Sequence, residues 1–152
     1  MLSRRGFTVN DDAIREGLAS LTIPAKFEVV SLLPTIIVDS THTPVATDTV
    51  CQALTDFHSL DGAKIRLCLP DEKNVQNYVT ALKKYGYSIE KLIVPDGVEF
   101  SDKEYAVCYG KSKKSMIKLM LEDLGTDTPL LISGDYAFVN PLRYELLATL
   151  GY

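Results

Sequence analysis

The feature that most constrains this chain of 152 residues is a repeated alternation between β-rich segments and segments with apolar residues at helical spacing. The expected strands cover residues 27–33, 35–39, 64–69, 91–95, 104–109 and 129–133, and the expected helices cover residues 44–60, 72–85, 112–124 and 139–150. A shorter helix that carries Ile14 and Leu18 comes before the first strand. This alternation is typical of an α/β, Rossmann-like domain with a mostly parallel sheet and helices on both faces. The first two strands, separated by Pro34, are the expected antiparallel exception.

Length and composition indicate one globular domain. A chain of this length can bury a core, and its hydrophobic fraction of 46% and charged fraction of 24% are ordinary globular values. We expect residues 1–9 to be the remnant of an interdomain linker and residues 10–152 to form a single domain. The net charge of −4, with basic and acidic residues interspersed, argues against a nucleic-acid partner.

The apolar segments and the cysteines indicate the environment of the protein. The longest apolar run, residues 27–34, is far too short to span a membrane, and no apolar segment typical of a signal peptide follows Met1. Cys51, Cys68 and Cys108 stand far apart without a C-x-x-C pair, which favours buried structural thiols over disulfides or metal ligands. We therefore expect a cytoplasmic protein with no membrane contact and no metal site in this chain.

Candidate binding loops follow from the predicted sheet, because ligands of such sheets bind beyond the carboxyl ends of the strands. Three expected loops fall there, at residues 39–44, 70–74 and 133–136. In the first, Thr43 is a good N-cap and Pro44 suits a first helical turn, so a helix start offers free N–H groups to an anion. Asp39 could accept hydrogen bonds from a sugar hydroxyl, and His42 could donate to a phosphate or orient Asp39. On spacing alone, the interpretation in which both residues merely cap the turn is the favoured one.

Two motifs at this place resemble sequences of the Mur ligase and folylpolyglutamate synthase family. Residues 23–30, I-P-A-K-F-E-V-V, resemble the stretch P-G-R-F-E-V-V of that family. Residues 37–44, I-V-D-S-T-H-T-P, resemble the motif D-G-A-H-N-P of folylpolyglutamate synthases and are equally similar to D-Y-A-H-T-P of the amino-acid-adding muramoyl-peptide synthetases. Weaker similarity at residues 72–75 and 131–134 extends the resemblance from Asp11 to about Leu147.

The resemblance implies a domain of the Mur ligase C-terminal type, taken from an ATP-dependent, ADP-forming ligase that joins a carboxylate to an amine. In this family a central domain carries the P-loop and most of the Mg²⁺ ligands and thus makes most of the contacts with the nucleotide. The C-terminal domain closes over ATP and helps to bind the incoming amino acid. That central domain, a small-molecule carboxylate and an amino acid would be the partners of this chain. By position in the motifs, the nucleotide-facing residues would be Lys26, Asp39 and His42, and the candidates on the substrate side of the cleft are Asp71, Lys73, Ser133 and Gly134.

The chain also departs from the family's pattern. Lys26 stands where the family has arginine, Thr43 where the folyl enzymes have asparagine, and Asp135 where a serine follows the glycine. Residues 110–112, G-K-S, copy only the end of a Walker A loop, because Tyr105 occupies the place of its first glycine. We therefore expect the isolated chain to catalyse neither ATP hydrolysis nor ligation. Two alternatives stay open: a non-catalytic module that keeps the fold as a binding or partner domain, and a small Rossmann-like nucleotide-binding domain, which the missing glycine fingerprint weakens.

Overall fold

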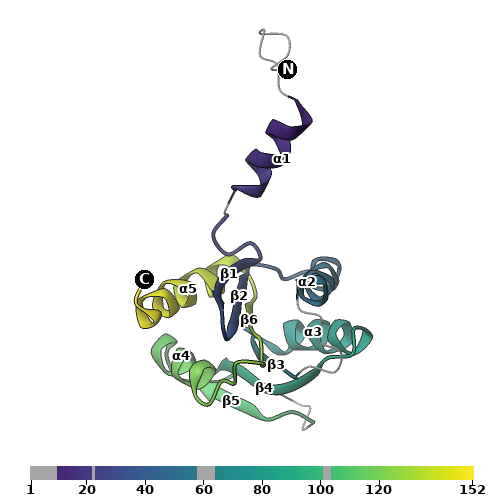
Figure 1. Ribbon diagram of the computed structural model, residues 1–152. Helices are drawn as coiled ribbons and strands as arrows, with labels where there is room; N and C mark the ends of the chain where they lie inside the picture. The colour runs from purple at the N-terminus through teal and green to yellow at the C-terminus, as the bar shows by residue number, and fades with distance from the viewer. Residues whose placement is uncertain (1–9, 22, 58–63, 101–103) are drawn as a thin grey trace.

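The computed structural model describes residues 10–21, 23–57, 64–100 and 104–152, which form a six-stranded sheet with helices on both faces (Figure 1). In chain order the elements are α1 (Asp11–Ala19), β1 (Glu28–Leu32), β2 (Thr35–Asp39), α2 (Pro44–Phe57), β3 (Lys64–Cys68), α3 (Glu72–Lys84), β4 (Ser88–Pro95), β5 (Val107–Gly110), α4 (Lys113–Leu121), β6 (Leu130–Ser133) and α5 (Tyr136–Leu150). The strands lie in the order β1-β2-β6-β3-β4-β5. Only β1 and β2 pair antiparallel, so the predicted mostly parallel α/β sheet is confirmed.

Each face of the sheet packs its own pair of helices. The side chains that face α2 and α3 include Ile37, Leu67, Leu92 and Leu131, and those that face α4 and α5 include Val38, Cys68, Ile93 and Ile132. Because helices cover both faces, β2 and β6 are buried along their whole length. These two neighbouring strands, both inside the sheet, therefore support the loops that follow them.

The element boundaries differ from the predicted ones by a few residues. α5 begins at Tyr136 rather than 139, because Oδ1 of Asp135 accepts the N–H of Phe138 at 2.8 Å and so caps the helix. α4 begins after Ser112, which is its cap, β4 begins at Ser88 rather than 91, and β5 begins at Val107 rather than 104. The expected linker remnant at residues 1–9 and the expected end of the helix at residues 58–60 lie outside the described residues.

α1 projects away from the rest of the protein (Figure 1). None of its residues is buried, and its apolar residues Ile14 and Leu18 are 47% and 66% exposed. It leads into β1 at the edge where β2 ends, since Glu28 pairs with Val38. No helix in the described part of the chain is long and apolar enough to cross a membrane.

Candidate functional site

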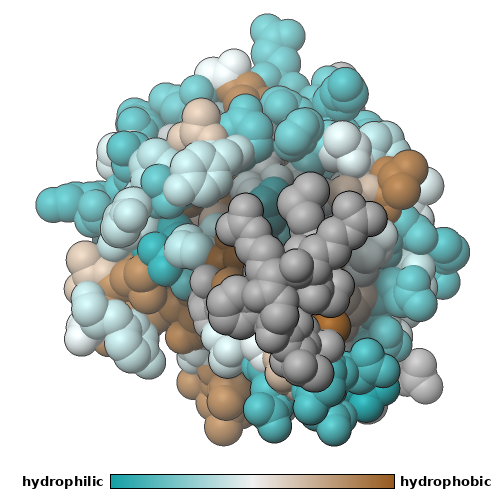
Figure 2. Space-filling model, turned by 90° about the horizontal axis from the view of Figure 1, so that it is seen from above, coloured by the Kyte–Doolittle hydropathy of each residue, from teal (hydrophilic) through white to brown (hydrophobic). Residues whose placement is uncertain are grey.

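Three loops meet at the carboxyl edge of the central strands. β6 lies between β2 and β3, with Asp39 opposite Ser133 and Cys68 opposite Ile132 in the parallel register. The loops that follow Asp39, Cys68 and Ser133 therefore emerge next to one another. Figure 2 looks onto this side of the molecule, and most of the surface visible around it is hydrophilic. The structure thus brings the three predicted loops together.

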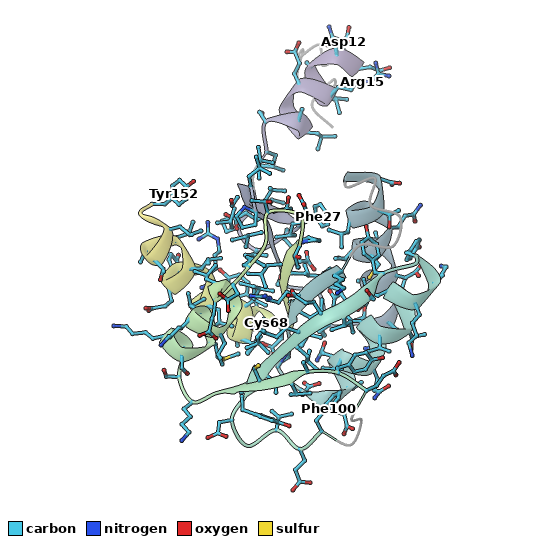
Figure 3. All side chains as sticks on the ribbon, turned by 60° about the horizontal axis from the view of Figure 1, so that its bottom comes forward. Asp12, Arg15, Phe27, Cys68, Phe100 and Tyr152 are labelled. Atoms are coloured by element: carbon cyan, nitrogen blue, oxygen red, sulfur yellow. The ribbon has the colours of Figure 1, made fainter. Side chains whose placement is uncertain are left out.

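Asp39 is the last residue of β2 and is only 4% exposed. Its Oδ1 accepts the N–H of Phe27 at 2.8 Å, which holds the chain where it enters β1. Phe27 is labelled in Figure 3. Its Oδ2 is also buried and has no hydrogen-bond partner among the described residues. A buried carboxylate oxygen without a donor costs free energy, so Oδ2 is an acceptor that a ligand hydroxyl or a water can satisfy. Oδ1 of this carboxylate therefore has a structural role, whereas Oδ2 is buried without a partner among the described residues.

The turn that carries Lys26 has an unusual backbone. Ala25 and Phe27 have φ angles of 56° and 45°, in the left-handed region that residues with side chains rarely adopt. Hydrogen bonds hold this turn: Ala25 donates its N–H to Oε2 of Glu28 at 2.8 Å, and Ser40 donates its N–H to the carbonyl of Ala25 at 2.7 Å. Strain of this kind persists where the surroundings over-determine the backbone, as at ligand sites. The Lys26 side chain stays exposed beside Asp39.

An ion pair with α5 fixes the same turn. Arg143 donates from its Nε and Nη2 to the two carboxylate oxygens of Glu28, with 2.6 Å between Nη2 and Oε1. The Glu28 and Arg143 side chains are only 11% and 13% exposed. Hydrogen bonding to the Arg143 guanidinium holds the pKa of Glu28 below its ordinary value, and the Ala25 N–H acts in the same direction. The conformation around Lys26 therefore depends on a charged Glu28.

His42 lies in the loop before α2 and is exposed. Thr43 caps the helix start as predicted: its Oγ1 accepts the N–H of Ala46 at 3.4 Å, and its carbonyl accepts the N–H of Thr47 at 2.9 Å. The amino end of α2, with its positive dipole end, faces the edge where Asp39 lies. An anion at this edge would meet a helix start and an exposed imidazole.

In the second loop, Asp71 caps a helix, whereas the Lys73 side chain is exposed. Asp71 is the N-cap of α3, and its carboxylate accepts the N–H of Asn74 at 2.9 Å and the side-chain amide of Asn74 at 3.0 Å. Both carboxylate oxygens accept from that amide, so Asp71 has a structural role in the protein as it stands. Lys73 is exposed and remains a candidate for substrate binding.

In the third loop, Ser133 points into the protein rather than into an open cleft. Its Oγ accepts the hydroxyl of Tyr78 at 2.7 Å and donates to the carbonyl of Thr41 at 3.0 Å, and Ser133 is 0% exposed. Gly134 has a φ angle of 151°, and a Cβ there would lie 2.9 Å from Phe138 and Pro70. This position thus requires glycine for close packing. The sequence motif had not revealed the inward direction of Ser133, because the tyrosine partner comes from α3.

Two hollows lie at this edge of the sheet. The first, of about 350 Å³, is lined by residues of both family-like motifs and by one face of α2: Lys26, Phe27, Asp39, Thr41, Ala46, Thr49, Val50 and Ala53. The second, of about 280 Å³, lies where β4 and β5 end, and its lining includes Asp96, Lys111, Lys113, Met116 and Phe138. The rule that placed the first three loops also applies to the ends of β4 and β5, so it could have found Asp96. Lys111 belongs to the incomplete Walker-like sequence G-K-S at residues 110–112.

The cysteines provide no chemistry at this edge. Cys51 and Cys68 are buried free thiols and Cys108 is half-buried. Burial raises the pKa of Cys51 to about 12, with the charge of Asp48 adding to the effect, and burial likewise raises the pKa of Cys68. Among the residues that the structure describes, no three His, Cys, Asp or Glu side chains come together as metal ligands.

Curated proteins match short parts of this chain, and no family model matches it. A Halobacterium salinarum protein described as "Probable bifunctional folylpolyglutamate synthase/dihydropteroate synthase" is 38% identical over 56 residues, which are 37% of this chain and 7% of that protein. The Escherichia coli dihydrofolate synthase/folylpolyglutamate synthase is 40% identical over 47 residues, which are 31% of this chain and 11% of that protein. The matched segments are thus small parts of longer proteins.

Solved structures match nearly the whole chain. A bifunctional folylpolyglutamate synthase/dihydrofolate synthase from Yersinia pestis, complexed with AMPPNP and Mn, has a TM-score of 0.69 at 19% identity, over 99% of this chain and 37% of that one. E. coli FolC in complex with DHPP and ADP has a TM-score of 0.71 at 19% identity and the same coverage. A single domain from Haemophilus ducreyi, assigned as a UDP-N-acetylmuramate:L-alanyl-gamma-D-glutamyl-medo-diaminopimelate ligase, has a TM-score of 0.56 at 15% identity, over 82% of this chain and 99% of that one. The resemblance in the motifs is therefore confirmed, and the chain has the fold of the C-terminal portion of folylpolyglutamate synthases, shared with a Mur ligase domain.

Proposed function

We propose that this chain is the C-terminal domain of an ATP-dependent, ADP-forming carboxylate–amine ligase of the folylpolyglutamate synthase type, which closes over ATP and helps to bind the incoming amino acid. The observation that carries the proposal is the shared hollow of Lys26 and Asp39 beside the start of α2. The fold adds support, since similar enzymes have been solved with AMPPNP or ADP. The chain spans 37% of those structures, so the remaining parts of the ligase would lie in other domains.

The residues at the edge fit a nucleotide in their chemistry. The open Oδ2 of Asp39 can accept a hydrogen bond from a ribose hydroxyl. The start of α2, His42 and the Lys26 ammonium supply donors and positive charge for phosphate oxygens. A lysine in place of arginine keeps the charge but loses the two-pronged geometry, so this contact would be weaker.

The rest of the active site would come from a central P-loop domain. ATP would supply the phosphoryl group that activates the carboxylate, and Mg²⁺ would be held with it mainly by that domain. Lys73 and the second hollow, beside Asp96 and Lys111, would face the substrates. In this assignment the chain closes the cleft, orients the ribose and excludes water.

Nucleotide binding by the purified chain tests the proposal. We expect ADP to bind weakly, with a dissociation constant on the order of millimolar, because a few contacts supply only about 4 kcal/mol. Amide chemical shifts should change at residues 26–27 and 39–43 and stay constant in α4. Shift changes confined to the opposite edge of the sheet, or none at saturating ADP, would contradict it.

A non-catalytic partner module is the second candidate. The departures at Lys26, Thr43 and Asp135 and the exposed apolar side chains of α1 favour it. The complete reading frame distinguishes the two: a G-x-x-G-K-[ST] loop upstream supports the ligase. A short protein without that loop, and without ADP binding at this edge, supports the module.

A further inference from the structure

Tyr78 is a fully buried tyrosine of α3 whose hydroxyl reaches the carboxyl edge of the sheet. It donates to Oγ of Ser133 at 2.7 Å, and that Oγ donates to the carbonyl of Thr41 at 3.0 Å. These three groups belong to α3, to the end of β6 and to the loop between β2 and α2. We infer that Tyr78 is a positioning residue, which acts through Ser133 to fix loop 40–43.

The chain of hydrogen bonds has a single direction. Ser133 uses its oxygen as acceptor for Tyr78 and its hydrogen as donor to Thr41, so each group completes the next. All three residues are at least nine-tenths buried, so water competes little and each bond polarises the other. Burial raises the pKa of Tyr78, and the charge of Asp39 adds to the effect, so the hydroxyl stays protonated at neutral pH.

Because of where it lies in the fold, this series of hydrogen bonds holds a loop of the candidate site in addition to its contribution to packing. The other hydrogen bonds of loop 40–43 run to the turn before β1 and to the start of α2: Ser40 donates its N–H to the carbonyl of Ala25, and Thr43 accepts the N–H groups of Ala46 and Thr47. The bond from Ser133 to Thr41 adds a connection to β6 and, through Tyr78, to α3. The open Oδ2 of Asp39 lies at the start of the same loop. α3 also carries Lys73 in its first turn. The hydrogen bonds from Tyr78 therefore connect the helix that follows the second candidate loop to the first loop. A change at Tyr78 should therefore loosen the loop without touching any ligand.

Hydrogen exchange in the ligand-free full chain tests the positioning role directly. Tyr78→Phe keeps the ring and removes the donor, and we expect the amides of loop 40–43 to exchange about five-fold faster relative to those of β3. Tyr87→Phe is the matched control, because Tyr87 is 5% exposed in the same core cluster but precedes β4 at the opposite edge. An unchanged ratio in Tyr78→Phe, or an equal change in Tyr87→Phe, would overturn the inference.

Ser133→Ala tests the same connection from its other end: by itself it should also speed the exchange of loop 40–43 relative to β3, and an unchanged ratio would overturn the inference even if Tyr78→Phe fails to fold. The Tyr78→Phe/Ser133→Ala double variant should loosen the loop no more than Ser133→Ala alone, since both changes interrupt the same series of hydrogen bonds. Additive loosening would show two independent effects and overturn the inference.

The consequence for binding rests on the proposed function and has its own measurement. We expect Tyr78→Phe to raise the dissociation constant of ADP about five-fold and Tyr87→Phe to leave it unchanged. Absence of ADP binding by the unsubstituted chain would sink the proposed function, while the exchange experiment would still decide the positioning role. A loosened loop with an unchanged dissociation constant would overturn the connection between the loop and binding.

Discussion

Glu28 joins the strained turn of the candidate site to α5. Its carboxylate accepts from Arg143 and from the N–H of Ala25, and its pKa lies below the ordinary value of 4.5. A carboxylate with a lowered pKa stabilises the fold fully above its unfolded-state pKa, and the contribution is lost as the pH falls through the folded-state pKa. We expect Glu28→Gln to lower the free energy of unfolding by about 2 kcal/mol at pH 7, because the largely buried Arg143 guanidinium loses the negative charge of its partner.

Urea unfolding across pH measures this effect. The difference between the unsubstituted chain and Glu28→Gln should be full at pH 7, begin to shrink as the pH falls below the unfolded-state value of 4.5, and be lost as the pH falls through the lower folded-state pKa, where native Glu28 also becomes neutral. Glu16→Gln, at an exposed position of α1, should show neither the loss nor the pH dependence. A difference that stays constant down to pH 3 would assign the loss to packing instead of charge.

Arg66 is a second residue whose role only the structure reveals. It lies in β3 and is 1% exposed, and its Nη1 donates to the carbonyls of Met120 at 2.8 Å and Glu122 at 2.6 Å at the end of α4. Nη2 and Nε reach the carboxylate of Glu90 at 3.2 and 3.3 Å. The alternation of side chains along β3 predicts opposite faces for Leu67 and Cys68, and the two residues do lie in different core clusters. It could not predict that a helix end would supply carbonyls to a strand arginine.

Arg66→Lys should therefore destabilise the protein by more than about 2 kcal/mol, because an ammonium cannot serve the helix carbonyls and the carboxylate together. Glu90→Gln should cost less than about 1 kcal/mol, because the Glu90 side chain is 31% exposed. Chemical denaturation of both variants measures the contrast. Equal losses would mean that the ion pair, and not the capping of α4, is the main contribution of Arg66.

At the scale of elements, the junction between β5 and α4 explains the sequence G-K-S at residues 110–112. Gly110 is buried, and a Cβ there would lie 2.2 Å from Cγ of Met116, while Ser112 caps α4. Residues 110–112 thus join β5 to the start of α4, and the strand and helix approach too closely at residue 110 for a side chain. Gly110→Ala should cost about 1–3 kcal/mol through overpacking, as measured by thermal unfolding.

A matched control for this junction removes Cγ of Met116, the atom that the new Cβ would meet. In a Met116→Ala background the Cγ is absent, so adding Gly110→Ala should cost clearly less than it does in the unsubstituted chain. An undiminished loss would place the requirement for glycine in the backbone rather than in the contact with Met116.

α1 shows how a predicted element can be present without contributing to the core. Its cap, with the N–H of Ala13 donating to Oδ1 of Asn10 at 2.8 Å, was readable from the sequence, whereas its lack of packing was not. Leu18→Ala should change the free energy of unfolding by less than about 0.5 kcal/mol, because the side chain is 66% exposed. Leu146→Ala, at a fully buried position, should cost about 2–5 kcal/mol under the same denaturation assay. A comparable loss at Leu18 would require α1 to pack against the sheet domain in solution.

At the scale of the whole molecule, the sequence predicted the sheet class and the three loops at one edge, because parallel strands all end on the same side. The insertion of β6 between β2 and β3 was not predictable from periodicity, since strand order depends on long-range packing. That insertion places Ser133 beside Asp39 and brings Tyr78 within reach of the first loop. The motif D-x-x-H therefore pointed to the candidate edge of the sheet, while the hydrogen bonds inside that edge come from residues 78 and 133, outside that motif.

The last prediction separates the binding role of Asp39 and His42 from their structural role in the proposed ligase. Asp39→Ala should destabilise the isolated chain by about 1–3 kcal/mol, because the buried N–H of Phe27 loses its acceptor. Asp39→Asn keeps an oxygen for that N–H, and His42→Ala removes an exposed side chain, so each should change stability by less than about 1 kcal/mol. If both residues face ATP, Asp39→Asn and His42→Ala should still lower ligase activity about ten-fold or more in the parent enzyme. Melting temperatures of the chain and turnover of the parent, measured on the same variants, decide the matter. Full turnover in Asp39→Asn and His42→Ala would leave the motif with a structural role alone.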